Sequence, residues 1–135
     1  MSKAPTNQLP KFSGSIESFL AVMEQAQRDF TWNEEQVTYY DGLQQDYLHQ
    51  LELDGLDYKG RARLATQLMK CRQHRRESKD TVRALSPLVE FLDSDKGRQL
   101  TNLMKEVLGR TRKVEKQMEN RVYVPRVLYE EAKPE

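Results

Sequence analysis

The sequence predicts an all-α protein, a helical bundle built on a long antiparallel helical hairpin and followed by an extended C-terminal tail. Charged residues make up 32% of the 135 positions, with only 6 Gly and 5 Pro, and this composition favours long amphipathic helices over sheets. Apolar residues also recur at alternating steps of three and four in the second half of the chain, which is the spacing of helices that pack along one another. The length corresponds to one domain.

The first half of the chain is expected to form two helices. The first covers about 16–29, with Ser15 at its N-cap, and the second covers about 34–53, with Thr31 or Asn33 at its N-cap. Hydroxyl and amide side chains at these positions can accept hydrogen bonds from the free N–H groups of a first helical turn.

The second half is expected to form two more helices. Gly55 is suited to end the second helix, because glycine tolerates the left-handed conformation, and Asp57 can cap the third. Pro87 either kinks the third helix or starts a new segment that ends near residue 92. A turn at 93–97 then precedes a fourth helix that runs to about Asn120.

The third and fourth helices each carry a predicted packing seam, the row of positions at which one helix meets another. In the third helix the row is Leu64, Leu68, Cys71, Arg75, Ser78, Val82 and Leu85. In the fourth helix it is Leu100, Leu103, Val107, Thr111, Val114 and Met118. Steps of three and four keep each row on one helix face, so both rows are expected to pack against other helices.

Three regions are expected along the chain. Residues 1–14 are rich in Pro, Ser, Asn and Gly and should form a flexible N-terminal arm, residues 15–121 the helical domain, and residues 122–135 the extended tail. In the tail, proline and alternating β-branched residues favour extended backbone. Tyr123 and Arg126 are candidates for recognition by a partner, and the alternative is a tail that folds back onto the helices.

The net charge of +1 hides a strong segregation of charge. The segment 29–57 holds eight acids and no Lys or Arg, whereas the segment 58–83 holds nine basic residues and two acids. A short turn makes these segments antiparallel neighbours, so the acids are expected to pair with the basic residues across the hairpin. Arg75 interrupts the seam, and either its stem runs to the seam's edge or Asp46 or Glu52 pairs with it.

The alternative is that the basic residues remain free for a partner. At about 100° per residue, five of them fall within an arc of about 60° on the third helix: Arg61, Arg72, Arg76, Lys79 and Arg83. On the fourth helix, four fall within about 40° and nearly opposite its apolar row: Arg98, Lys105, Arg112 and Lys116. Such ridges suit phosphates or an acidic protein groove. Aromatic residues do not interleave with them, which argues against single-strand stacking.

The sequence predicts no enzyme, metal site or cofactor. His49 and His74 fall on different helices, and the chain has no HExxH, CxxC or phosphate-binding glycine motif. The single Cys71 lies on the third helix's seam, where a buried thiol is expected rather than a nucleophile. No apolar run reaches about 18 residues, so no membrane span is expected, and one cysteine fits the cytoplasm.

A combination of short motifs in the second half is the least generic part of the chain. It consists of Arg75, Arg76, Lys79 and Asp80, then LSPL at 85–88, then a charged helix ending in R-x-Y-x-P-R-V-L at 121–128. In these elements residues 60–128 resemble small charged helical proteins of unassigned role from phages and prophages of Gram-positive bacteria. The resemblance implies a mobile-element origin, a location in the cytoplasm of a bacterial host and no catalysis.

These observations lead to one functional expectation and two alternatives. The expectation is a non-enzymatic accessory protein that binds a host protein or ribonucleoprotein complex and inhibits or redirects it, for example a CRISPR–Cas nuclease, as anti-CRISPR proteins do. The first alternative is a helical nucleic-acid-binding or transcription-regulatory protein that uses the basic ridges. The second is a structural homodimer whose seams pair between chains.

Overall fold

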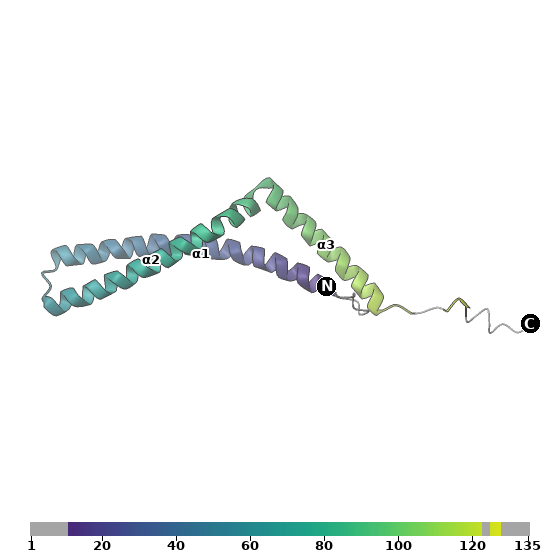
Figure 1. Ribbon diagram of the computed structural model, residues 1–135, viewed down its shortest axis with the longest axis horizontal. Helices are drawn as coiled ribbons and strands as arrows, with labels where there is room; N and C mark the ends of the chain where they lie inside the picture. The colour runs from purple at the N-terminus through teal and green to yellow at the C-terminus, as the bar shows by residue number, and fades with distance from the viewer. Residues whose placement is uncertain (1–10, 123–124, 128–135) are drawn as a thin grey trace, which may run out of the picture.

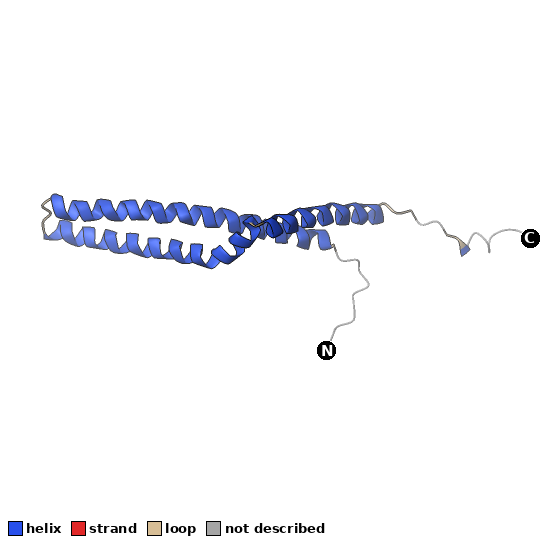
Figure 2. Ribbon diagram, turned by 90° about the horizontal axis from the view of Figure 1, so that it is seen from above, coloured by secondary structure: helices blue, strands red, loops and turns tan. Residues whose placement is uncertain are grey.

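The computed structural model describes residues 11–122 and 125–127. It contains three helices, α1 (Phe12–Leu53), α2 (Tyr58–Asp93) and α3 (Asp95–Glu119), and no strand among the described residues. Helices α1 and α2 form a long antiparallel hairpin, and α3 turns back from the end of α2 towards the start of α1 (Figure 1). Seen from above, α1 and α2 lie side by side along the hairpin, starting at the turn that joins them (Figure 2). The predicted all-α fold built on a helical hairpin is confirmed.

The first helix is one unbroken element of 42 residues, so the predicted break after residue 29 is wrong. The Asn33 side chain does not cap a new helix but donates to the Asp29 carbonyl oxygen one turn back, at 2.7 Å. The predicted start at Ser15 is also wrong, because α1 begins at Phe12 and its N-cap, Lys11, makes no side-chain capping bond. The last three residues of the expected arm are therefore helical, and residues 1–10 lie outside the described part of the chain.

The tip of the hairpin forms as predicted. Gly55 has a φ of +56°, the left-handed conformation that glycine adopts without strain. Asp57 then caps α2, since its Oδ1 accepts a hydrogen bond from the Gly60 N–H at 2.7 Å. These two residues reverse the chain between α1 and α2.

Helix α2 runs through Pro87 to Asp93, so of the two alternatives at the proline the restart is wrong. A proline has no N–H, and the carbonyl of Arg83, four residues earlier, therefore lacks its usual helical donor. One residue before the proline, the Ser86 hydroxyl donates to the Val82 carbonyl oxygen at 2.7 Å. Packing on both sides of Pro87 holds the helix together, because the seam continues beyond it to the buried Leu92.

The core is the seam between α1 and α2 rather than a globular centre. The predicted α2 seam is confirmed, since its positions are all buried or half-buried: Leu64, Leu68, Cys71, Arg75, Ser78, Val82 and Leu85. It continues at the same spacing through Val89 and Leu92, which are 6% and 4% exposed. From α1, Leu20 and Ala26 are buried. The seam is thin, because no large described side chain falls below 2% exposure.

A close backbone contact sets the direction of α3. Ser94 caps the helix by accepting from the Gly97 N–H at 3.2 Å, while its own hydroxyl donates to the Phe91 carbonyl oxygen. Gly97 is buried, and a Cβ there would overlap that carbonyl oxygen and lie 2.7 Å from Leu92 Cα. The start of α3 therefore packs directly on the backbone at the end of α2.

Helix α3 faces the rest of the protein with a different row from the one predicted. The row that is buried or half-buried is Gly97, Thr101, Met104, Leu108, Thr111 and Glu115. Within the chain the predicted seam is not the packing face apart from Thr111, because its other members are 37–57% exposed: Leu100, Leu103, Val107, Val114 and Met118. The close contact at Gly97 explains the difference, since it turns the glycine side of α3 inward and leaves the larger apolar side outward.

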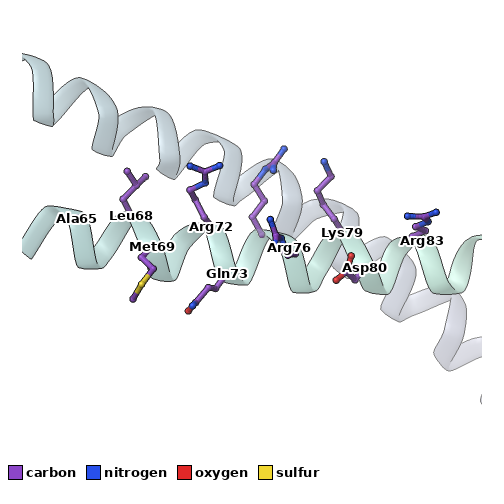
Figure 3. Close-up of a pocket in the computed structure, with 10 residues that line it drawn as sticks. Ala65, Leu68, Met69, Arg72, Gln73, Arg76, Lys79, Asp80 and Arg83 are labelled. Carbon is purple, nitrogen blue, oxygen red and sulfur yellow. The ribbon is translucent and has the colours of Figure 1, made fainter.

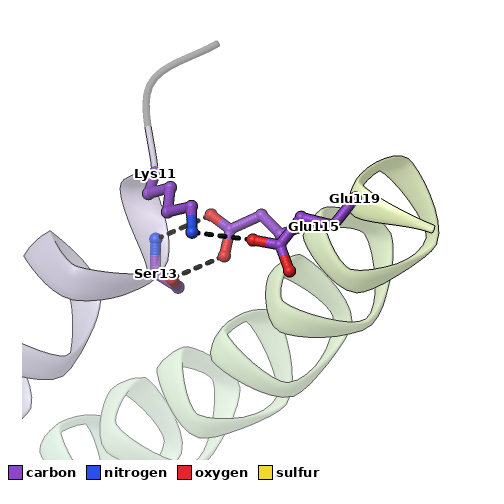
Figure 4. A network of polar contacts seen from close by, with 4 residues as sticks. All are labelled: Lys11, Ser13, Glu115 and Glu119. Atoms are coloured by element: carbon purple, nitrogen blue, oxygen red, sulfur yellow. Dashed lines mark hydrogen bonds and ion pairs between the residues drawn. The ribbon is translucent and has the colours of Figure 1, made fainter. Parts of the chain in front are cut away.

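Four polar residues fasten the end of α3 to the start of α1 (Figure 4). Glu115 accepts from the Ser13 hydroxyl at 2.6 Å and from the Ser13 N–H at 3.3 Å, so a carboxylate from α3 bonds a free N–H of the first turn of α1. The Lys11 ammonium donates to Glu119 at 2.7 Å. This hydrogen bond raises the pKa of Lys11 and lowers the pKa of Glu119.

Candidate functional site

A basic groove runs along one flank of α2 (Figure 3). It has a volume of about 820 Å³. Its lining residues all come from α2: Ala65, Leu68, Met69, Arg72, Gln73, Arg75, Arg76, Lys79, Asp80 and Arg83. At about 100° per residue these positions span one side of the helix, next to the packing seam. We call this feature the α2 groove.

Most of the basic ridge predicted for this helix lies in the α2 groove. Arg72, Arg76, Lys79 and Arg83 line it and are exposed, whereas Arg61 is exposed on the same helix but does not line it. In Figure 3, Arg72 and Lys79 project on one side of α2. The structure therefore brings four of the five predicted residues to one surface.

The predicted charge pairing across the hairpin is wrong for these four residues. Among the described residues, one ion pair joins α1 to α2, between Arg75 and Asp41. Arg72, Arg76 and Lys79 have no described carboxylate within 4.0 Å, and neither has Arg83. The reason is geometric, because these residues lie roughly 90° around α2 from the seam and so project past α1 rather than onto it.

Arg75 combines features of its two predicted alternatives. Its side chain is 32% exposed, and its guanidinium pairs with Asp41, whose side chain is 51% exposed. The stem thus lies in the seam while the charged end reaches the seam's edge. The predicted partners Asp46 and Glu52 are wrong. Since the pair is open to solvent, it contributes little to stability.

One end of the α2 groove is apolar. Towards the hairpin tip it is lined by Ala65, the half-buried Leu68 and Met69, which is 52% exposed. Leu68 belongs to the predicted seam, and Met69 was not among the predicted site residues. The signal was present, because Ala65, Met69, Arg72 and Arg76 follow one another at steps of four, three and four.

Cys71 and His74 both contact Tyr40 of α1. Cys71 is 3% exposed, and its Sγ donates to the Tyr40 carbonyl oxygen at 3.4 Å. Burial raises the pKa of the thiol, an effect that Arg75 opposes and Asp41 reinforces, so the thiol stays protonated at neutral pH. His74 stacks on the Tyr40 ring with centroids 5.5 Å apart. No group of three possible metal ligands occurs in the described part of the chain.

The basic residues predicted on α3 do not form a second free ridge. All four are exposed, but Arg112 pairs with Glu17 of α1 at 2.9 Å. Arg98 donates twice to the Asp93 carbonyl oxygen, at 2.7 and 3.1 Å. Two of the four thus hold α3 in place, which leaves Lys105 and Lys116 at that surface.

The tail candidates are only partly described. Arg126 is exposed, and Val122 and Val127 are 82% and 65% exposed, so these two valines do not pack on the helices. Tyr123, together with Leu128, lies outside the described residues. The α2 groove is therefore the candidate site that the described residues define best.

Comparisons with known proteins leave the site to be interpreted from its own residues. No protein-family model matches the chain, and neither a curated protein nor a solved structure matches it significantly. Within the described residues, no helix has the length and apolar character that crossing a membrane requires.

Proposed function

We propose that the protein is a non-enzymatic binding protein whose α2 groove receives an acidic, amphipathic helix of a partner protein. The observation that carries this proposal is the exposed basic row beside an apolar end. Arg72, Arg76 and Lys79 have no described ion-pair partner, and Leu68 and Met69 continue the same groove. An amphipathic helix binds such a groove by placing apolar anchors at one end and acids along the rest.

The apolar end and a carboxylate favour a protein partner over nucleic acid. Phosphate backbones are bound through cations, which need no exposed methionine beside them. Asp80 lies in the groove itself, and Asp41 stands at its edge through its pair with Arg75. Both carboxylates would repel a continuous row of phosphates, whereas a protein helix can place an uncharged or basic residue opposite each one.

The resemblance to phage and prophage proteins supports a specific version of this proposal. A protein of a mobile element that occupies an acidic surface of a host protein or ribonucleoprotein would block or redirect that complex. A CRISPR–Cas nuclease is the most concrete target of this kind. The α2 groove is the surface that we assign to such an inhibitor, and arginine is among the residues that contribute most at protein interfaces.

The test uses designed helical peptides as probes. The groove spans residues 65–83, or about 27 Å at 1.5 Å per residue, so a peptide of about 18 residues matches it. The probe carries Glu on one face and Leu at one end of that face. Two comparison probes are used: the same peptide with Lys in place of Glu, and a short DNA duplex. Fluorescence anisotropy should show that only the acidic peptide binds, and that its affinity falls as salt is added.

Two variants with equal charge change locate the binding surface. Replacing Arg72, Arg76 and Lys79 with Glu should abolish peptide binding, whereas replacing Lys105, Lys113 and Lys116 of α3 with Glu should leave it intact. Met69→Glu should also weaken it, because it places a charge in the apolar end. The proposal would be overturned if the protein bound the DNA duplex, if the triple Glu variant at Arg72, Arg76 and Lys79 abolished that binding, and if Met69→Glu left it unchanged. That result would support the nucleic-acid alternative.

A further inference from the structure

Helix α3 carries a row of apolar side chains on its outer face. Its members are Leu100, Leu103, Val107, Val114 and Met118, which are 37%, 57%, 43%, 51% and 43% exposed. We call this row the α3 strip. Single exposed apolar residues are ordinary on protein surfaces, but a contiguous apolar patch marks an interaction site. The inner edge of α3, which adjoins the strip and contains the buried Leu108, already packs on the protein's own helices.

The spacing of the α3 strip is that of a helix packed along another helix. With Thr111 included, the steps from Leu100 to Met118 are three, four, four, three and four, the pattern of knobs in a helix pair. The first three steps sum to eleven residues, which keeps the row nearly straight along the helix. Its length is about 27 Å. The occupant that fits is therefore a helix of similar length.

We infer that this occupant is the α3 strip of a second copy of the chain, packed antiparallel about a twofold axis. A twofold interface must be complementary to itself, and the strip meets this requirement. With the axis near residue 109, Leu100 lies opposite the partner's Met118, and Leu103 opposite the partner's Val114. Val107 then lies opposite the partner's Thr111. Each contact occurs twice.

Charges beside the strip favour the antiparallel direction. Glu106 and Arg110 lie on the outer edge of the strip, both are exposed, and neither has an ion-pair partner among the described residues. Antiparallel pairing brings the two outer edges together, so Glu106 faces the partner's Arg110 and the reverse. Parallel pairing would set this edge against the partner's inner edge, which packs on its own hairpin, and would leave both charges without a partner.

The surface of the single chain is large enough for such a contact. The chain exposes 11718 Å², whereas a compact protein of 15.9 kDa exposes about 7,400 Å². Subtracting about 3,400 Å² for the twenty residues outside the description, counted as fully extended, leaves about 8,300 Å². That is about 1,800 Å² more than a compact protein of the remaining mass exposes, which is about 6,500 Å². A standard interface takes about 800 Å² from each partner.

The first test is the mass of the full-length protein in solution. Light scattering after gel filtration at micromolar concentration should give the mass of a dimer. Leu103→Glu with Val107→Glu should give a monomer with unchanged helix content by circular dichroism. The matched control is Val22→Glu with Trp32→Glu, which changes two similarly exposed apolar residues of α1 and should stay dimeric. A monomeric wild type, or a dimer that survives the α3 variant, overturns the inference.

Exchange of charges tests the direction of pairing without removing apolar surface. Glu106→Arg alone places like charges together at both symmetric contacts and should weaken the dimer by about tenfold. The double variant Glu106→Arg/Arg110→Glu should restore it. A double variant as weak as the single one overturns the antiparallel arrangement.

Cross-linking gives an independent readout of the register. In a Cys71→Ala background, a mixture of Leu103→Cys chains and Val114→Cys chains should form disulfide-linked pairs. Leu103→Cys alone should not, because the two copies of residue 103 lie about 16 Å apart along the helices, beyond the reach of a disulfide. Cross-linking of Leu103→Cys alone would show parallel pairing. That result would refute the inference. The inference is also refuted if the full-length protein is a monomer and dimerises only after deletion of residues 121–135, because the tail would then cover the strip.

The inference is separable from the proposed function. The α2 groove and the α3 strip share no residue, so the Glu substitutions at Arg72, Arg76 and Lys79 should leave the dimer intact. Peptide binding without dimerisation would overturn the inference alone, and a dimer that binds no acidic peptide would overturn the proposed function alone.

Discussion

Replacing Gly97 with alanine should destabilise the protein, although alanine is the better helix former. Alanine in a helix gains up to about 1 kcal/mol over glycine. At position 97, however, the new Cβ would overlap the Phe91 carbonyl oxygen and lie 2.7 Å from Leu92 Cα, and backbone atoms cannot move as a flexible side chain can. Overpacking of this kind costs about 1–3 kcal/mol. Since the obstacle is backbone, we expect the upper part of that range and a net loss of about 1–2 kcal/mol.

Gly109 provides the matched control in the same helix. A Cβ there would meet nothing within 4 Å, so Gly109→Ala should stabilise the protein by about 0.5–1 kcal/mol. The two variants should differ by about 2–3 kcal/mol in urea denaturation followed by circular dichroism, measured at one protein concentration. In thermal denaturation this corresponds to roughly 10 °C, at about 4 °C per kcal/mol for a chain of this size. Equal stability of the two variants would refute the proposed close contact between α2 and α3.

Three further predictions concern the polar and sulfur groups described above. Arg75→Leu should leave the free energy of unfolding within about 1 kcal/mol of wild type, because the pair with Asp41 is open to solvent; a loss above about 2 kcal/mol in urea denaturation would show a larger role. The ion pair between Lys11 and Glu119 should stabilise the α1–α3 contact at intermediate pH, where both side chains are charged. Because the pKa of Glu119 is lowered in the folded protein, this contribution to stability is lost as pH falls below 4.5. Because the pKa of Lys11 is raised, the contribution is also lost as pH rises above 10.5. An NMR titration should show the pKa of Glu119 returning towards 4.5 in Lys11→Ala, and no change would contradict the pair. Cys71 should react with a thiol reagent at pH 8 only as the protein unfolds, since it is 3% exposed and its pKa is raised; fast labelling of the folded protein would contradict its burial.

The hairpin could be predicted because its determinants are local. The seam of α2 repeats along one helix, and Gly55 and Asp57 end and begin helices by their own conformational and hydrogen-bonding preferences. The same kind of signal failed within α1. Asn33 has a capping side chain, but its amide bonds a carbonyl inside the helix, and neither glycine nor proline lies nearby to stop the helix.

The site could be predicted only in part. Helical periodicity places Arg72, Arg76 and Lys79 on one side of α2, but whether the acids of α1 reach them depends on side-chain directions across the hairpin, which the periodicity does not contain. The inward face of α3 was missed for a related reason. Gly97 and Thr101 give almost no apolar signal, although glycine allows the closest approach of two helices, whereas the larger Leu103 and Val107 gave the stronger pattern on the outer side.

The contact between the two ends of the helical region has a consequence for chain connectivity. Lys11 and Glu119 touch at 2.7 Å, so α1 begins where α3 ends, far from the turn at 54–57. A circular permutant that joins these ends and opens the chain in that turn would keep every helix intact, because exposed turns are where such openings are tolerated. Its helices would follow the order α2, α3, α1. The bond between Ser13 and Glu115, now 102 positions apart in sequence, would then close a short loop, although the folded structure would be the same.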